Sequence, residues 1–131
     1  MVSFRHFAPW LPIASCQEVI SDKLQGCNAG AHFTHHYPLA LKSGIKKEIA
    51  DGRRPQGMSD DEEIVYDFSI ELHRNKRASD TIFQRAEKRF GKQGIVDMTG
   101  ISGYYTLLAM ELNMAQYELP KDGKKLERFP K

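Results

Sequence analysis

Three histidines stand within five residues of one another and are the clearest chemical feature of this chain. His32 and His36 are four residues apart, so on a helix they share one face, while His35 lies partly to the side. Imidazole titrates near neutral pH and can both donate and accept a proton. We therefore take His32 and His36 as the first candidates for acid/base catalysis. The competing interpretation is that these histidines only fill a core or cap a helix.

The same histidine pair could instead supply two ligands to a metal ion. Two histidines at this spacing occur in zinc sites, but the glutamate of the zinc-protease pattern is missing between them. A third ligand would have to come from His73, from Glu18 or from a neighbouring subunit. We expect no native metal and no other cofactor.

Groups that could contact a substrate are fewer. Arg53 lies in a loop rich in glycine and proline and could meet an anionic substrate. The hydroxyl of Tyr105 could point into a pocket, although aromatic residues on a buried helix more often belong to the core. Cys27 has no second cysteine at a Cys-x-x-Cys distance, and we expect it to be buried or incidental.

Length and composition favour one globular domain. The chain has 131 residues, of which 40% are hydrophobic and 27% charged, as in ordinary globular proteins. Its net charge of +2 argues only weakly for a nucleic-acid partner, and no run of about 18 apolar residues could span a membrane. We expect neither partner. Two cysteines are too few for a disulfide framework, which favours a cytoplasmic protein with reduced thiols.

Apolar spacing and capping residues predict an all-α fold of about six helices. The clearest signal is a capping box at Ser59 and Glu62, which begins a helix that runs to about Lys76. Shorter helices are expected after Ser15, over residues 29–41 with a kink at Pro38, and over residues 45–50. The apolar face of the capped helix consists of Ile64, Val65, Phe68 and Leu72.

Two further helices are predicted in the second half of the chain. Ser79 and Asp80 begin one of them, and Gly91 ends it. The other, over residues 93–116, is apolar nearly all round, so it should lie centrally or in a subunit interface. We therefore expect a homo-oligomer. The residues of the first helix predicted to face inward are Ile82, Phe83, Ala86 and Phe90.

The chain divides into an arm, a domain and a tail. Residues 1–15 contain Pro9 and Pro12, which interrupt the apolar stretch and disfavour a cleaved signal sequence. We expect an N-terminal arm over residues 1–15, a helical domain over residues 16–120 and a charged C-terminal tail over residues 121–131.

A series of segments, in this order along the chain, resembles the carboxymuconolactone decarboxylase-like family. The resemblance covers about residues 29–120, and its most diagnostic segment is GYYTLLAMELN at 103–113. It implies an all-helical, alkylhydroperoxidase-like fold that assembles into homotrimers, hexamers or similar oligomers. The other matching segments are HYPLALKSG at 36–44, IADGRRP at 49–55, VYDF at 65–68, ELHR at 71–74, SD at 79–80 and GIVD at 94–97.

This resemblance also implies a reaction. The named member of the family removes CO2 from γ-carboxymuconolactone, in aromatic compound catabolism, without a metal or organic cofactor. By resemblance, this chain would perform similar lyase-type chemistry on a lactone or small organic acid. His36 matches the family's histidine and would be the proton donor, with His32 as its partner and Glu18 as a possible orienting group.

The sequence departs from the family at the site itself. His32 stands where longer relatives usually have a glutamate, and Glu18 lies only near the place of a second one. A related branch has two redox cysteines where this chain has Ala29 and His32, so peroxidase activity based on a disulfide is disfavoured. Two alternatives to the lyase stay open: a non-catalytic oligomeric binding protein of the same fold, and a metal or redox protein that uses the histidine cluster or Cys27.

Overall fold

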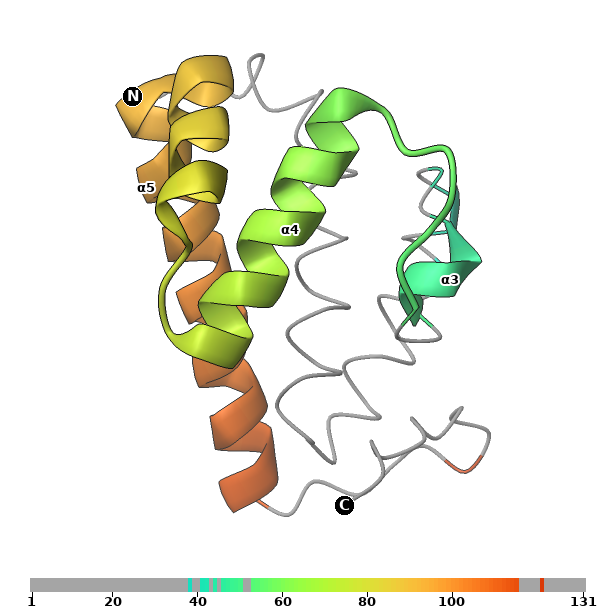
Figure 1. Cartoon of the computed structure of the whole chain (residues 1–131). Helices are drawn as coiled ribbons and strands as arrows, with labels where there is room; N and C mark the ends of the chain where they lie inside the picture. The colour runs from blue at the N-terminus through green and yellow to red at the C-terminus, as the bar shows by residue number, and fades with distance from the viewer. Residues whose placement is uncertain are drawn as a thin grey trace, which may run out of the picture.

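The computed structural model of the chain describes residues 38, 41–42, 44, 46–50, 53–115 and 121. Within these residues the elements are helices, namely α3 (Lys47–Ala50), α4 (Asp60–Asn75) and α5 (Asp80–Met114), and the described part contains no strand (Figure 1). The all-α class predicted from sequence is confirmed there. The arm, the helix expected after Ser15, most of the helix expected over 29–41 and nearly all of the tail lie outside the described residues.

Local side-chain chemistry begins and ends α4. Ser59 has an extended backbone, its Oγ accepts a hydrogen bond from the Glu62 amide at 3.4 Å, and Glu62 Oε2 accepts one from the Ser59 amide at 2.7 Å. This reciprocal pair is the predicted capping box. At the other end Lys76 adopts a left-handed conformation with φ of 62°, and its Nζ donates to the His73 carbonyl at 2.9 Å. The predicted limits of this helix are therefore confirmed.

Gly91 divides α5 into two helical halves. Its φ of 70° and ψ of 178° are not helical, and the chain changes direction at this residue (Figure 1). This combination of angles is essentially restricted to glycine, because a Cβ would clash with the backbone. The helix break predicted at Gly91 is confirmed. The second half ends at Met114, close to the predicted end at residue 116.

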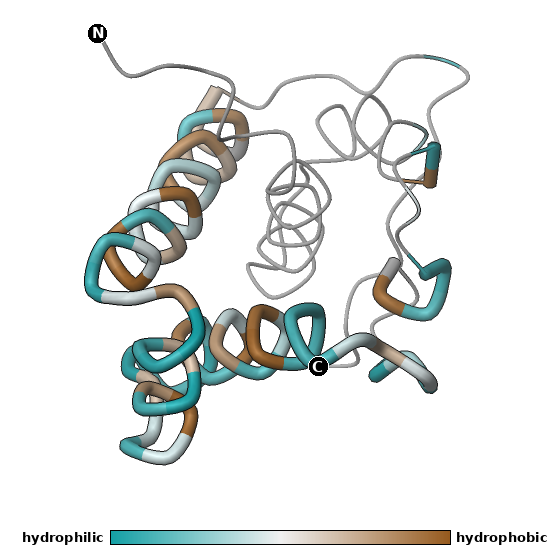
Figure 2. The backbone as a smooth tube through the Cα atoms, turned by 90° about the horizontal axis from the view of Figure 1, so that it is seen from above, coloured by the Kyte–Doolittle hydropathy of each residue, from teal (hydrophilic) through white to brown (hydrophobic). Residues whose placement is uncertain are grey.

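The described core forms where α4 packs against both halves of α5. Val65 and Phe68 from α4 meet Ala86 from the first half and Met98 from the second half, and all are almost fully buried. Brown apolar and teal polar residues alternate around the helical turns in Figure 2, as expected for helices with one buried side. Further side chains pack around this cluster: Ile64, Leu72, Ala78, Ile82, Phe90 and Ile95.

Two predictions about α5 need correction. Phe83 is 40% exposed, because the core lies against Ile82, Ala86 and Phe90, whose spacing of four residues places Phe83 beside the buried side. The second half of α5 is not buried all round either. Its buried side carries Met98, Ser102 and Ala109, while its opposite side exposes large apolar residues. The central position predicted for this helix is therefore wrong for the described chain, and the alternative of a subunit interface stays a prediction.

None of the helices in the described part is long and apolar enough to cross a membrane.

Candidate functional site

The structure describes two of the five candidate site residues. Arg53 is exposed in the loop before α4, and its amide donates a hydrogen bond to the Glu48 carbonyl at 2.8 Å. Tyr105 is half-buried on the second half of α5, where its ring meets that of Tyr104 edge to face at a centroid distance of 5.4 Å. The contacts shown for these two residues thus lie on different elements. The predicted catalytic residues His36, His32 and Glu18 lie outside the described residues.

The neighbour of Arg53 has a structural role that the sequence did not reveal. Arg54 Nη2 lies 3.2 Å from both Glu63 and Asp67 on α4, and its guanidinium stands 5.9 Å from the centre of the Tyr66 ring. Hydrogen bonding to Asp67 raises the pKa of Arg54 above its usual value. Because two carboxylates already neutralise it, Arg54 is a poor candidate for binding an anionic substrate. Of the two arginines, Arg53 remains the candidate for that role.

A lysine on the other side of the loop also holds it in place. Lys46 Nζ donates to the carbonyl of Gln56 at 2.7 Å and to that of Gly57. The neighbouring Pro55 is fully buried. The loop that carries Arg53 is therefore fixed to the segment before α3 and to α4, which gives Arg53 a defined position.

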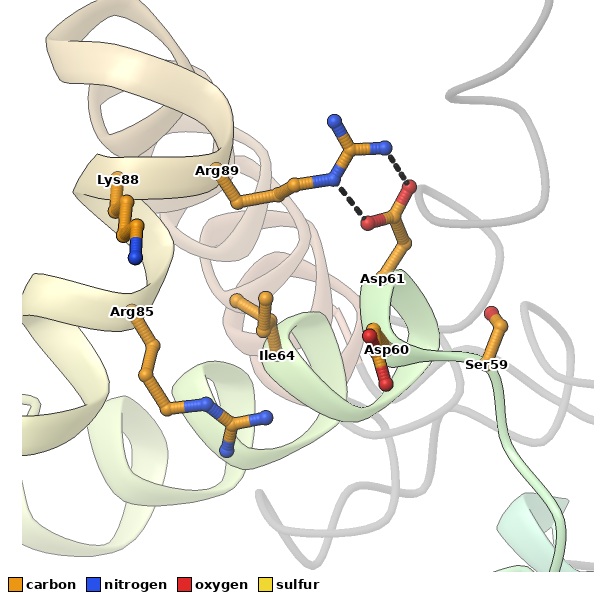
Figure 3. A pocket seen from close by; sticks show the side chains of 7 residues that line it. All are labelled: Ser59, Asp60, Asp61, Ile64, Arg85, Lys88 and Arg89. Atoms are coloured by element: carbon orange, nitrogen blue, oxygen red, sulfur yellow. Dashed lines mark hydrogen bonds and ion pairs between the residues drawn. The ribbon is translucent and has the colours of Figure 1, made fainter.

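A recess of about 700 Å³ opens between the start of α4 and the first half of α5. Its chemically active lining is charged, with Asp60 and Asp61 on α4 facing Arg85, Lys88 and Arg89 on α5, while Ile64 lies between the two groups (Figure 3). Ser59 completes the lining.

Most of the charges around this recess already balance one another. Arg89 holds Asp61 through two hydrogen bonds, and Arg85 lies 3.6 Å from Glu63 and 3.8 Å from Asp67 (Figure 3). The described lining contains no imidazole or thiol, so this recess lacks the groups that transfer protons near neutral pH. It could hold an anionic group beside Lys88, but it offers no catalyst for the lyase chemistry.

His73 is the one histidine within residues 53–115, and its position does not suit a proton donor. It is 8% exposed near the end of α4. Burial lowers its pKa, and the nearby charge of Lys76 lowers it further. The imidazole is therefore neutral at pH 7.

Metal binding can be judged only for part of the chain. Among the residues that the structure describes, no group of three or more His, Cys, Asp and Glu side chains could hold a metal ion. His73, which sequence analysis considered as a third ligand, belongs to no such group. The histidine pair itself lies outside this part, so the absence of a metal stays a prediction.

The carboxylates that organise this region could have been found by helical spacing. Glu63 and Asp67 are four residues apart on α4, and Arg85 and Arg89 are four residues apart on α5. Such pairs share a helix face, so each pair forms a charged row beside the apolar face. The spacing alone does not reveal that the two rows face each other.

No protein-family model, no curated protein and no solved structure matches the chain.

Proposed function

We propose that this protein is a cofactor-independent lyase-type enzyme that acts on a lactone or small organic acid, similar to carboxymuconolactone decarboxylases. His36 is the proton donor, His32 is its partner on the same helix face, and Glu18 orients the pair. Arg53 binds an anionic group of the substrate, and Tyr105 lines the pocket. The chemistry of the histidine pair carries the proposal, because His73, the other histidine near the helical core, is buried and neutral.

The positions of the family-like segments support this proposal. VYDF contributes Val65 and Phe68 to the core, and SD stands at the start of α5. GIVD follows the break at Gly91 and contains Gly94, which is buried. Segments chosen for their resemblance thus coincide with positions that determine packing or helix limits, as expected if they encode a common helical fold.

The proposed reaction needs one proton and no external electrons. The bond between the substrate carbon and its carboxylate breaks, CO2 leaves, and the electron pair of that bond delocalises onto the conjugated lactone. The His36 imidazolium then donates a proton to carbon, and water restores the proton to the imidazole. Arg53 has no part in the proton transfer; it positions the anionic substrate.

The test is CO2 release from γ-carboxymuconolactone, with three proteins compared. We expect release by the wild-type protein, loss of release in His36→Ala, and retention in His35→Ala, which removes a neighbouring imidazole from another side of the helix. Arg53→Ala should raise KM with little change in kcat, because it removes ground-state binding. No release from folded wild-type protein, or full activity in His36→Ala, would contradict the proposed chemistry.

A second candidate function is a non-catalytic oligomeric binding protein of the same fold. The observation that favours it is the row of exposed apolar residues on α5, which suits a contact with another protein surface. In either function we propose a homo-oligomer, a trimer or hexamer by resemblance. A folded oligomer that releases no CO2 would favour this second function over the lyase.

A further inference from the structure

The exposed side of the second half of α5 carries a regular apolar row. Val96, Leu107, Met110 and Met114 are 63%, 52%, 54% and 83% exposed, on the side opposite buried Met98. Gly100 and Gly103 fall on the same side. We call this row the α5 stripe; its members are Val96, Gly100, Gly103, Leu107, Met110 and Met114.

The stripe has the spacing of a coiled-coil seam. Its members follow one another at alternating intervals of four and three residues, which is the a/d pattern of a heptad repeat. A helix whose outer side faces water normally carries charged residues there. Over residues 93–115, however, the charged residues are Asp97 and Glu111, and neither is in the stripe. The pattern is therefore typical of a helix that another helix covers.

The two glycines of the stripe indicate close approach by that second helix. No described atom of this chain lies within 4 Å of a Cβ built on Gly100 or Gly103. Packing within the described chain thus gives no reason for glycine at these positions, although glycine is less favourable than alanine inside a helix. A second helix that crosses here could use the space that the missing side chains leave.

The charges beside the stripe identify the second helix as the same helix of another copy. With Gly100 at a and Gly103 at d, Lys92 occupies a g position and Asp97 the following e position. In a parallel pair, a g residue faces the e residue five positions later in the second copy, so Lys92 meets Asp97 of the second copy twice by symmetry. Gln93 Nε2 donates to Asp97 Oδ1 at 2.7 Å, which leaves Oδ2 available for this contact.

The opposite orientation is disfavoured by charge. In an antiparallel pair that overlaps the same stripe, e positions face e positions. Asp97 would then lie near Glu111 of the second copy, and these two carboxylates repel each other.

We infer that two copies of this chain associate through the α5 stripe, in parallel and in register, around a two-fold axis that runs along the helices. The inference rests on the homo-oligomer proposed above and names its contact. It predicts an assembly with an even number of copies, either a dimer or a hexamer built from three such pairs.

The first experiment measures mass by light scattering at micromolar concentration for wild type, Leu107→Glu and Gln84→Glu. Gln84 is exposed on the first half of α5, outside the stripe, so it controls for the added charge. We expect an even-numbered assembly for wild type and Gln84→Glu, and half that number for Leu107→Glu, with unchanged helical circular dichroism. A monomeric or trimeric wild type, or an unaffected Leu107→Glu, would overturn the inference. A monomer would also refute the proposed oligomer, whereas an unaffected Leu107→Glu leaves it standing.

Charge reversal tests the partner and its register. Lys92→Glu and Asp97→Lys should each weaken self-association by about tenfold, because each creates two like-charge contacts. The double variant should restore it. Residues five apart do not face each other on one helix, so rescue reports a contact between copies. Single variants that associate like wild type, or a double variant without rescue, would count against the parallel register.

Cross-linking tests the orientation directly. In a background with Cys16→Ser and Cys27→Ser, Met110→Cys places one thiol on each helix at equivalent positions. Mild oxidation should join the two copies in a parallel pair and should leave the control Gln84→Cys uncrosslinked. Equal cross-linking of the two variants, or none in Met110→Cys, would exclude the proposed pairing.

Discussion

Arg89 on α5 and Asp61 on α4 form a two-pronged ion pair although 28 residues separate them. Arg89 Nη2 lies 2.7 Å from Asp61 Oδ2, and Nε bonds the other carboxylate oxygen (Figure 3). Hydrogen bonding to Asp61 raises the pKa of Arg89 above its usual value. The pair connects the first turn of α4 to the first half of α5 at the surface, outside the apolar core.

Removing this ion pair should lower the thermal midpoint slightly and in a salt-dependent way. Asp61→Asn keeps the shape of the side chain but removes the charge that Arg89 binds. Asp60→Asn is a matched control, because both residues lie in the first turn of α4 and favour the helix dipole equally. We expect the larger decrease for Asp61→Asn in low salt, and a smaller difference between the variants in 1 M NaCl, about 3 Å in Debye length. Equal decreases at low salt would show that the pair adds nothing.

Stability should fall with pH because of His73. Burial lowers the pKa of the folded imidazole below 6.5, so between these two values the unfolded chain binds a proton that the folded chain does not. The contribution of His73 is therefore complete above pH 6.5 and is lost as the pH falls towards the folded pKa. Urea denaturation at about pH 7.5 and about pH 5.5 should show a smaller decrease for His73→Gln than for wild type. Identical decreases would contradict this account.

The backbone at Gly91 should not tolerate a side chain. Gly91→Ala places a Cβ at a φ of 70° and ψ of 178°, and we expect it to cost about 1–3 kcal/mol of the free energy of unfolding. Gln84→Ala, at an exposed helical position of the same element, should change stability by less than about 0.5 kcal/mol. If Gly91→Ala unfolds at the same urea concentration as wild type, the turn between the two halves of α5 has another conformation.

Two phenylalanines should differ in their contribution to stability. Phe68 is 2% exposed in the core, and Phe68→Ala should cost about 3–5 kcal/mol. Phe83 is 40% exposed, and Phe83→Ala should cost about 1 kcal/mol or less, because much of its ring remains in water in the folded state. Chemical denaturation of both variants measures the difference. A larger loss for Phe83→Ala would restore the inward position that sequence analysis predicted for it.

Helix limits could be read from the sequence because neighbouring residues set them. Ser59 and Glu62 cap α4 through bonds between residues three apart, and Gly91 breaks α5 through its own backbone angles. The candidate site was less accessible. Its histidine pair is a hypothesis about chemistry from spacing alone, and of the two loop arginines the sequence did not show that Arg54 would be neutralised by α4.

Local chemistry thus determined that the described chain is helical and where α4 and α5 begin, break and end. The tertiary structure alone decided that Asp61 pairs with Arg89, that Phe83 lies beside the core, and that the second half of α5 buries Met98 while it exposes Leu107. The physical reason is range. Caps and breaks act within one helical turn, whereas burial and ion pairing depend on which helices meet, and a helix that is apolar nearly all round does not itself specify which side faces the core.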